Sequence, residues 1–122
     1  MNKSYDLESA ASLIPLLRVL NREIRERSDA LAQSIARARQ LERDHSKIGL
    51  RERTALLAVL RAEISTHKRE IRETRRELGR LGCLLDEEDL ATVHIPGRNG
   101  EIEDGFVWHA GASQVEAAVR ER

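Results

Sequence analysis

The chain has 122 residues, of which 34% are charged and 2% are aromatic, and its 21 basic side chains balance its 21 acidic ones. This composition is typical of long helices or coiled coil, and the length predicts a single domain over residues 1–122. The formal net charge of zero gives no whole-chain preference for nucleic acid or for an anionic membrane.

Helical signals begin near the start of the chain. Asp6 suits the N-cap of a helix that opens with "LESAAS". Pro15 has no amide hydrogen and disfavours helical geometry at Ile14, so we expect a kink or a restart there. Apolar residues then recur in steps of three, four or seven up to the connection "DHSKIG". This first ladder consists of Leu13, Leu17, Leu20, Ile24, Leu31, Ala38, Leu41 and Ile48.

A second ladder with the same spacing follows the connection. It consists of Leu50, Leu57, Leu60, Ile64, Ile71, Leu78, Leu81 and Leu85. Gly79 and Gly82 are both candidates for the C-cap of this helix. Two ladders separated by charged residues predict a mainly α fold, with a long antiparallel two-helix coiled-coil hairpin over residues 6–82.

Folding the ladders antiparallel about Gly49 sets their register. The expected apolar pairs are Leu17 with Leu81, Leu20 with Leu78, Ala38 with Leu60, and Leu41 with Leu57. The same register places polar residues on the seam. The expected neighbours there are Arg27 with Ile71, Leu31 with His67, and His45 with Arg53. Such positions usually fix the register or reach solvent.

Apolar stripes remain beside the seam of this hairpin. Near its base lie Ile14, Leu16 and Val19, which we expect the C-terminal segment to cover. Near its tip lie Ile35, Leu56 and Val59, for which the chain has no cover left. An uncovered stripe of this kind predicts a homodimer built on residues 30–64 as a four-helix bundle.

The pattern changes after residue 85, and residues 86–122 predict a small β unit with a tail. The stretches "ATVHIPG" and "FVWHA" have the composition of short strands, and "GRNGEIEDG" between them has the composition of a turn. Together they predict a β-hairpin that packs on the base of the helical hairpin. Phe106 and Trp108 alternate onto one face and are the expected packing anchors. The tail at residues 112–122 is compatible with an edge strand or with a short helix.

The two ends of the sequence resemble a bacterial family catalogued as domain of unknown function 2203. The N-terminal match consists of Tyr5, Leu7, Glu8, Ala11, Leu13, Pro15, Leu16, Leu17 and Arg18. The C-terminal match is the run "LGRLGCLLDEEDLATVHIPGRNGEIEDGFVWHAG", in which Trp108 and Gly111 fit a family strand. The sequence "QVEAAVRER" replaces the family's usual tail, so His109 fits either this strand or a later Trp-His strand. The resemblance supports the fold and implies no activity.

The sequence has few residues arranged for chemistry. Glu63 and His67 share a helix face, and His94 and His109 lie on the two expected strands, which makes these four residues a weak candidate polar site. The chain lacks H-E-x-x-H, a second cysteine and phosphate-binding glycine motifs. We therefore expect no enzymatic activity, no metal and no cofactor, with a metal-binding protein as a minor alternative.

Charge is distributed unevenly along the chain. Residues 37–80 carry 13 basic and 7 acidic side chains, whereas residues 84–122 carry 3 basic and 9 acidic ones. The basic run "HKREIRETRRELGR" allows weak nucleic-acid binding as an alternative function, although it lacks interleaved aromatic residues. The single Cys83, the absence of an 18-residue apolar run and the polar N-terminus indicate a cytoplasmic protein without a membrane segment. The favoured function is a non-catalytic, oligomeric protein-interaction or scaffold module.

Overall fold

The computed structural model describes residues 3–43 and 49–118, and its contacts divide the chain into two compact units. The sheet unit comprises Met1–Arg25 and Glu73–Arg122, and the helical unit comprises Glu26–Arg72. The single domain expected from the length stays a prediction. The connection between the ladders, with the expected seam positions of His45 and Ile48, falls outside the described residues.

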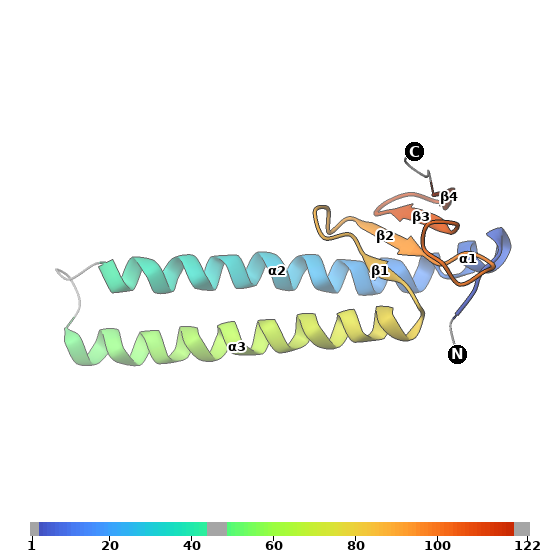
Figure 1. Cartoon of the computed structure of the whole chain (residues 1–122). Helices are drawn as coiled ribbons and strands as arrows, with labels where there is room; N and C mark the ends of the chain where they lie inside the picture. Colours follow the sequence, from blue (N-terminus) through green and yellow to red (C-terminus); the bar gives the residue numbers. More distant parts are fainter. Residues whose placement is uncertain (1–2, 44–48, 119–122) are drawn as a thin grey trace. The chain divides into compact units, whose positions relative to one another are not determined.

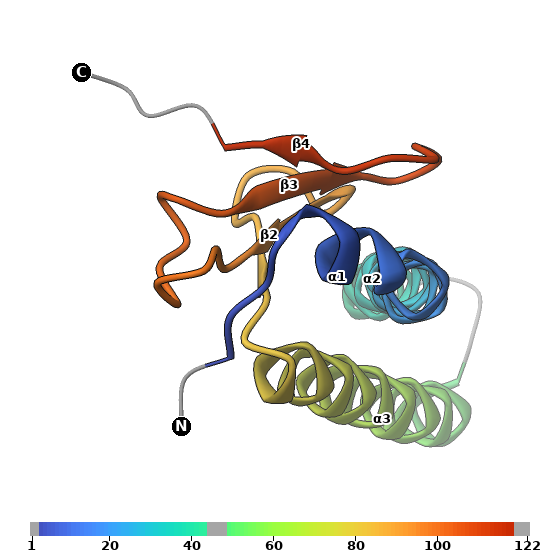
Figure 2. The same ribbon diagram turned by 90° about the vertical axis from the view of Figure 1, so that its right-hand side faces the viewer.

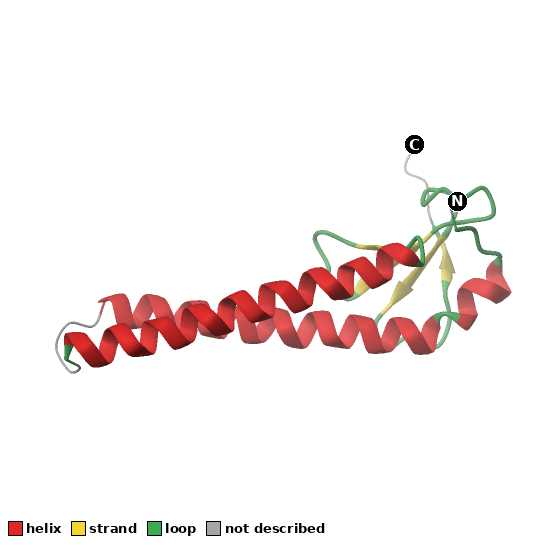
Figure 3. Cartoon of the chain, turned by 90° about the horizontal axis from the view of Figure 1, so that it is seen from below, coloured by secondary structure: helices red, strands yellow, loops and turns green. Residues whose placement is uncertain are grey.

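Long packed helices dominate the structure, which confirms the mainly α fold (Figures 1 and 3). The short helix α1 spans Leu7–Ser12, and the long helices are α2 (Ile14–Arg43) and α3 (Leu50–Arg80). Asp6 caps α1 as expected, because its Oδ1 accepts a hydrogen bond from the amide of Ser9 at 2.8 Å. The helix also restarts next to Pro15. This proline falls in the first turn of α2, where its missing amide hydrogen breaks no helical hydrogen bond.

The C-terminal part of the described chain forms a four-stranded antiparallel sheet with the order β1-β2-β3-β4. The strands are β1 (Leu84–Leu85), β2 (Thr92–Ile95), β3 (Phe106–His109) and β4 (Glu116–Ala117). The expected hairpin corresponds to β2 and β3, and the structure adds a two-residue strand on each side of it. β4 shows that the tail contains an edge strand, whereas residues 119–122 fall outside the described chain.

The core of the sheet unit forms where the sheet packs on the first turns of α2 (Figure 2). Its buried members are Ala10, Ile14, Leu17, Leu20, Ile24, Leu78, Cys83, Leu85, Val93, Ile95, Trp108 and Val115. Trp108 is 1% exposed, and its indole Nε1 donates to the carbonyl of Ala112 at 3.0 Å. Phe106 is partly buried against the same cluster. Trp108 therefore occupies the position expected of a packing anchor, with Phe106 at its margin.

One prediction about this core is wrong. The C-terminal segment covers Ile14 but leaves Leu16 43% exposed and Val19 64% exposed. The buried face of α2 instead runs through Ile14, Leu17, Leu20 and Ile24, which follow one another at helical spacing. Leu16 and Val19 project away from that face.

Polar contacts join α2 and α3 inside the helical unit. Arg27 lies on the seam as expected, and its Nη1 donates to His67 Nδ1 at 3.3 Å, one turn before Ile71. Ser34 Oγ donates to Glu63 Oε2 at 3.4 Å. These contacts place antiparallel helix turns beside one another, as the folded ladders predicted. No helix in the described chain is long and apolar enough to cross a membrane.

Candidate functional site

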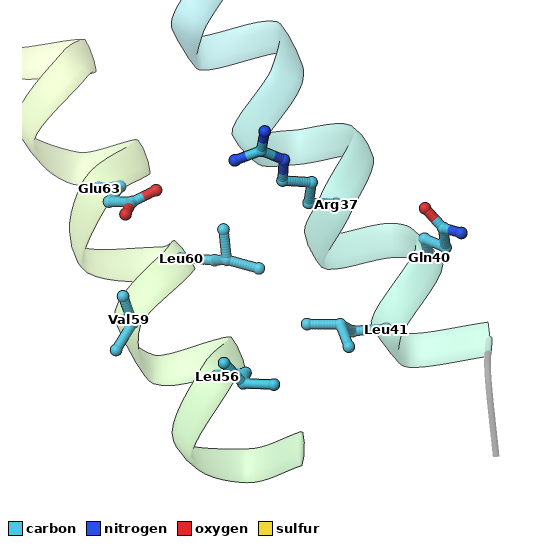
Figure 4. A pocket seen from close by; sticks show the side chains of 7 residues that line it. All are labelled: Arg37, Gln40, Leu41, Leu56, Val59, Leu60 and Glu63. Atoms are coloured by element: carbon cyan, nitrogen blue, oxygen red, sulfur yellow. The ribbon is translucent and has the colours of Figure 1, made fainter. Parts of the chain in front are cut away.

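An open apolar groove lies between α2 and α3 within the helical unit (Figure 4). Its volume is about 440 Å³. α2 contributes Arg37, Gln40 and Leu41, and α3 contributes Leu56, Val59, Leu60 and Glu63. Leucines from both helices form the floor of the groove. Leu41 and Leu60 belong to the two ladders, and Leu56 lies next to the second ladder. A surface of this kind can bind an apolar partner.

The groove contains two residues of the expected dimer stripe. Leu56 is 41% exposed and Val59 is 57% exposed, although both are apolar. Ile35 is half-buried and does not line the groove. The groove therefore contains only two of the three residues of the expected stripe. Ile35 lies outside it, because helical periodicity directs Ile35 away from Arg37 and Gln40.

The four residues of the weak polar site have separate local partners. Glu63 and His67 lie on α3 in the helical unit, where they bond to Ser34 and Arg27. His94 and His109 lie on β2 and β3 in the sheet unit. They are diagonal neighbours, because His94 pairs with Val107 and His109 pairs with Thr92.

The sheet histidines belong to a hydrogen-bonded network that starts at Asp86. His94 Nε2 donates to Asp86 Oδ1 at 2.9 Å. The other oxygen of Asp86 accepts from the amides of Glu88 and Asp89 at 3.1 Å and 2.8 Å. The hydrogen bond from His94 and those from the two amides hold the pKa of the Asp86 carboxyl below its ordinary value. Asp86 therefore fixes the chain reversal between β1 and β2.

Asp89 continues this network to the second histidine. Thr92 Oγ1 donates to Asp89 Oδ2 at 2.8 Å and lies 3.1 Å from His109 Nδ1. Because the single hydroxyl proton of Thr92 is directed to Asp89, the imidazole must be the donor in the second contact. Thr92 Oγ1 thus donates to Asp89 and accepts from His109, which links the acidic turn to β3. The hydrogen bond from Thr92 and that from the amide of Ala91 lower the pKa of Asp89.

The single cysteine and the candidate metal ligands complete the set of reactive groups expected from the sequence. Cys83 is buried, and burial raises the pKa of its thiol to about 11, so it stays protonated near neutral pH. Among residues 3–43 and 49–118, no group of three or more His, Cys, Asp or Glu side chains is positioned to hold a metal ion.

Sequence reasoning missed two parts of these arrangements. It did not assign Arg37 and Gln40 to the groove, because charged and amide side chains interrupt the apolar pattern used to find it. It also missed Asp86 and Asp89, although the acidic run "DEEDL" directly before a strand with alternating Thr92 and His94 was a usable signal.

The fold and the groove together define a mainly helical protein with a small antiparallel sheet and an apolar surface of the kind used for binding. The chain belongs to the family described as "Uncharacterized conserved protein (DUF2203)", whose model matches residues 3–118. This result confirms the family resemblance at the two ends of the sequence. Searches of curated proteins and of solved structures gave no match.

Proposed function

We propose that the protein is a non-catalytic interaction or scaffold module that acts as a homodimer. The observation that carries this proposal is the groove between α2 and α3, in which Leu56 and Val59 remain exposed. Helical packing of a second copy on this face forms a four-helix bundle and removes both side chains from water. We place this assembly in the cytoplasm, where the reduced, buried Cys83 is stable.

Burial of apolar area supplies the free energy of this association. Fully burying a valine or leucine side chain is worth about 1.5–3 kcal/mol relative to leaving it exposed. The two chains of a symmetric dimer each contribute Leu56 and Val59, so these partly exposed side chains supply the apolar centre of an interface. Charged residues at its rim then determine which partner is accepted.

Self-association can be tested by sedimentation or light scattering at micromolar concentration. We expect the wild-type chain of 13.8 kDa to have twice that mass in solution. Val59→Glu places a carboxylate in the interface and should weaken the dimer by about 100-fold, because a buried charge without a partner is costly.

The matched control is Val19→Glu. Val19 is 64% exposed and Val59 is 57% exposed, and both lie on long helices, but Val19 does not line the groove. This control should remain dimeric. A wild-type protein that stays monomeric as its concentration rises would refute the proposal, and so would equal effects of the two substitutions.

Nucleic-acid binding is the second candidate function. Arg72, Arg75 and Arg76 are exposed and lie on one side of α3, and Glu70, Glu73 and Glu77 fall on another side. Such a surface supports weak, sequence-independent contacts that fade steeply with salt. Sub-micromolar binding to RNA or DNA at physiological salt, abolished by replacing these three arginines, would make this the leading function.

A further inference from the structure

The groove carries opposite charges on its two walls. Arg37 projects from α2 and Glu63 projects from α3, and both border the leucine floor (Figure 4). The hydrogen bond from Ser34 to Glu63 places Glu63 about one helical turn from Arg37 along α2. Within residues 3–43 and 49–118, Arg37 and Glu63 do not form an ion pair with each other. Both charges can therefore bind a partner.

The placement of these charges restricts how a second copy can dock. In a symmetric dimer the same surface occurs on both chains, so every contact is made twice. A twofold axis parallel to the helices places α2 of one chain over α3 of the other at the same level. Arg37 then faces the partner's Glu63 twice. Stacking α2 on the partner's α2 would instead bring Arg37 against its own copy, with repulsion between like charges.

We infer that the groove recognises a second copy of this chain through a twofold axis parallel to α2 and α3, with Arg37 of each protomer paired to the partner's Glu63. This inference rests on the proposed homodimer and specifies its geometry. The apolar floor provides the attraction, and the two reciprocal ion pairs select the orientation. The same arrangement sets Leu56 and Val59 against the α2 wall of the partner.

A charge-exchange experiment tests this geometry directly. Arg37→Glu and Glu63→Arg are prepared as separate full-length proteins. Alone, each variant places two pairs of like charges in its own dimer, and self-association should weaken about tenfold or more. In an equimolar mixture both interface pairs again have opposite charges, so a heterodimer should form with near wild-type affinity. An ion pair within one chain could not be restored by mixing.

The control is the ion pair between Arg61 and Glu42, which also joins α3 to α2 at 3.6 Å and does not line the groove. Arg61→Glu and Glu42→Arg should leave the mass unchanged, both alone and mixed. Circular dichroism checks that every variant keeps its helices.

A cross-linking experiment gives a second readout that does not depend on affinity. Arg37→Cys and Glu63→Cys proteins are mixed and oxidised. We expect a disulfide-linked heterodimer from the mixture and little cross-linking from either protein alone. A monomeric wild-type protein would refute the proposed function itself. If the wild-type protein is dimeric but neither mixture gives a heterodimer, the proposed twofold axis is wrong, whereas the proposed self-association is retained.

Discussion

Asp86 is the residue on which the reversal between β1 and β2 depends. Its two oxygens accept hydrogen bonds from a histidine side chain and from two backbone amides. A second hydrogen bond holds the same segment. The side-chain amide of the buried Asn21 on α2 donates to the carbonyl of Leu90. The reversal is thus held by polar contacts at both of its ends, and the contacts of Asp86 favour its ionised form.

The lowered pKa of Asp86 makes stability depend on pH in a definite direction. A carboxyl whose folded pKa lies below its unfolded value, about 3.9, stabilises the fold above that value. The contribution is lost as the pH falls through the folded pKa. Asp86→Asn should therefore lower the melting temperature at pH 7, and its difference from wild type should shrink as the pH approaches about 2.

Glu87→Gln serves as the control for this prediction, because Glu87 is an exposed neighbouring carboxylate. Thermal melts between pH 2 and pH 7 give the comparison. A difference between Asp86→Asn and wild type that stays constant over the whole range would show that ionisation of Asp86 contributes nothing.

At the scale of secondary-structure elements, the end of α3 shows how local chemistry stops a helix. Gly82 has a φ of 79°, a conformation that favours glycine. The amide of Cys83 donates to the carbonyl of Leu78 at 3.0 Å, and the amide of Gly82 donates to that of Gly79 at 2.9 Å. This pair of bonds is the Schellman motif. Of the two candidate C-cap glycines, Gly82 ends the helix and Gly79 lies inside it.

The two glycines should respond to alanine in opposite directions. An added Cβ at Gly79 meets no atom within 4 Å, so Gly79→Ala should stabilise the protein by about 0.5–1 kcal/mol. At Gly82 the added Cβ would lie 3.0 Å from Lys3 Cβ and 3.3 Å from Pro96 Cγ. Because of this crowding and the positive φ, Gly82→Ala should lower the free energy of unfolding by about 1 kcal/mol or more. Urea denaturation measures the change in the free energy of unfolding for each variant, and two changes of the same sign would contradict the prediction.

The elements found from the sequence were those with a local signal. The long helices, the cap at Asp6 and the restart near Pro15 each depend on residues within a few positions of one another. β1 was missed, and the tail that contains β4 was left open between an edge strand and a short helix, because a two-residue strand is too short to show alternation and is defined by its pairing with β2 or β3. The exposure of Val19 was missed for a related reason. A single helical pattern does not show which of two apolar stripes the sheet will cover.

At the scale of the whole molecule, part of the candidate site could be predicted and part could not. Leu56 and Val59 stand beside the ladder of α3, so the sequence was sufficient to mark them as apolar and outside the seam. The position of Arg37 opposite Glu63 depends on the register between the helices, which the leucine spacing defines only to within about one turn. The placement of these two charges on opposite walls of the groove therefore could be found only from the structure.

Assembly and stability should be linked if the groove is the dimer interface. A dimer that separates on unfolding is stabilised by mass action, so its melting temperature rises with protein concentration. With an unfolding entropy of about 2.1 cal/mol/K per residue over two chains, each tenfold increase should raise the melting temperature by about 2–3 °C. Calorimetry over a hundredfold concentration range should show this rise for wild type and for Val19→Glu. Val59→Glu should melt at a temperature independent of concentration, and a rise equal to that of wild type would place the interface elsewhere on the chain.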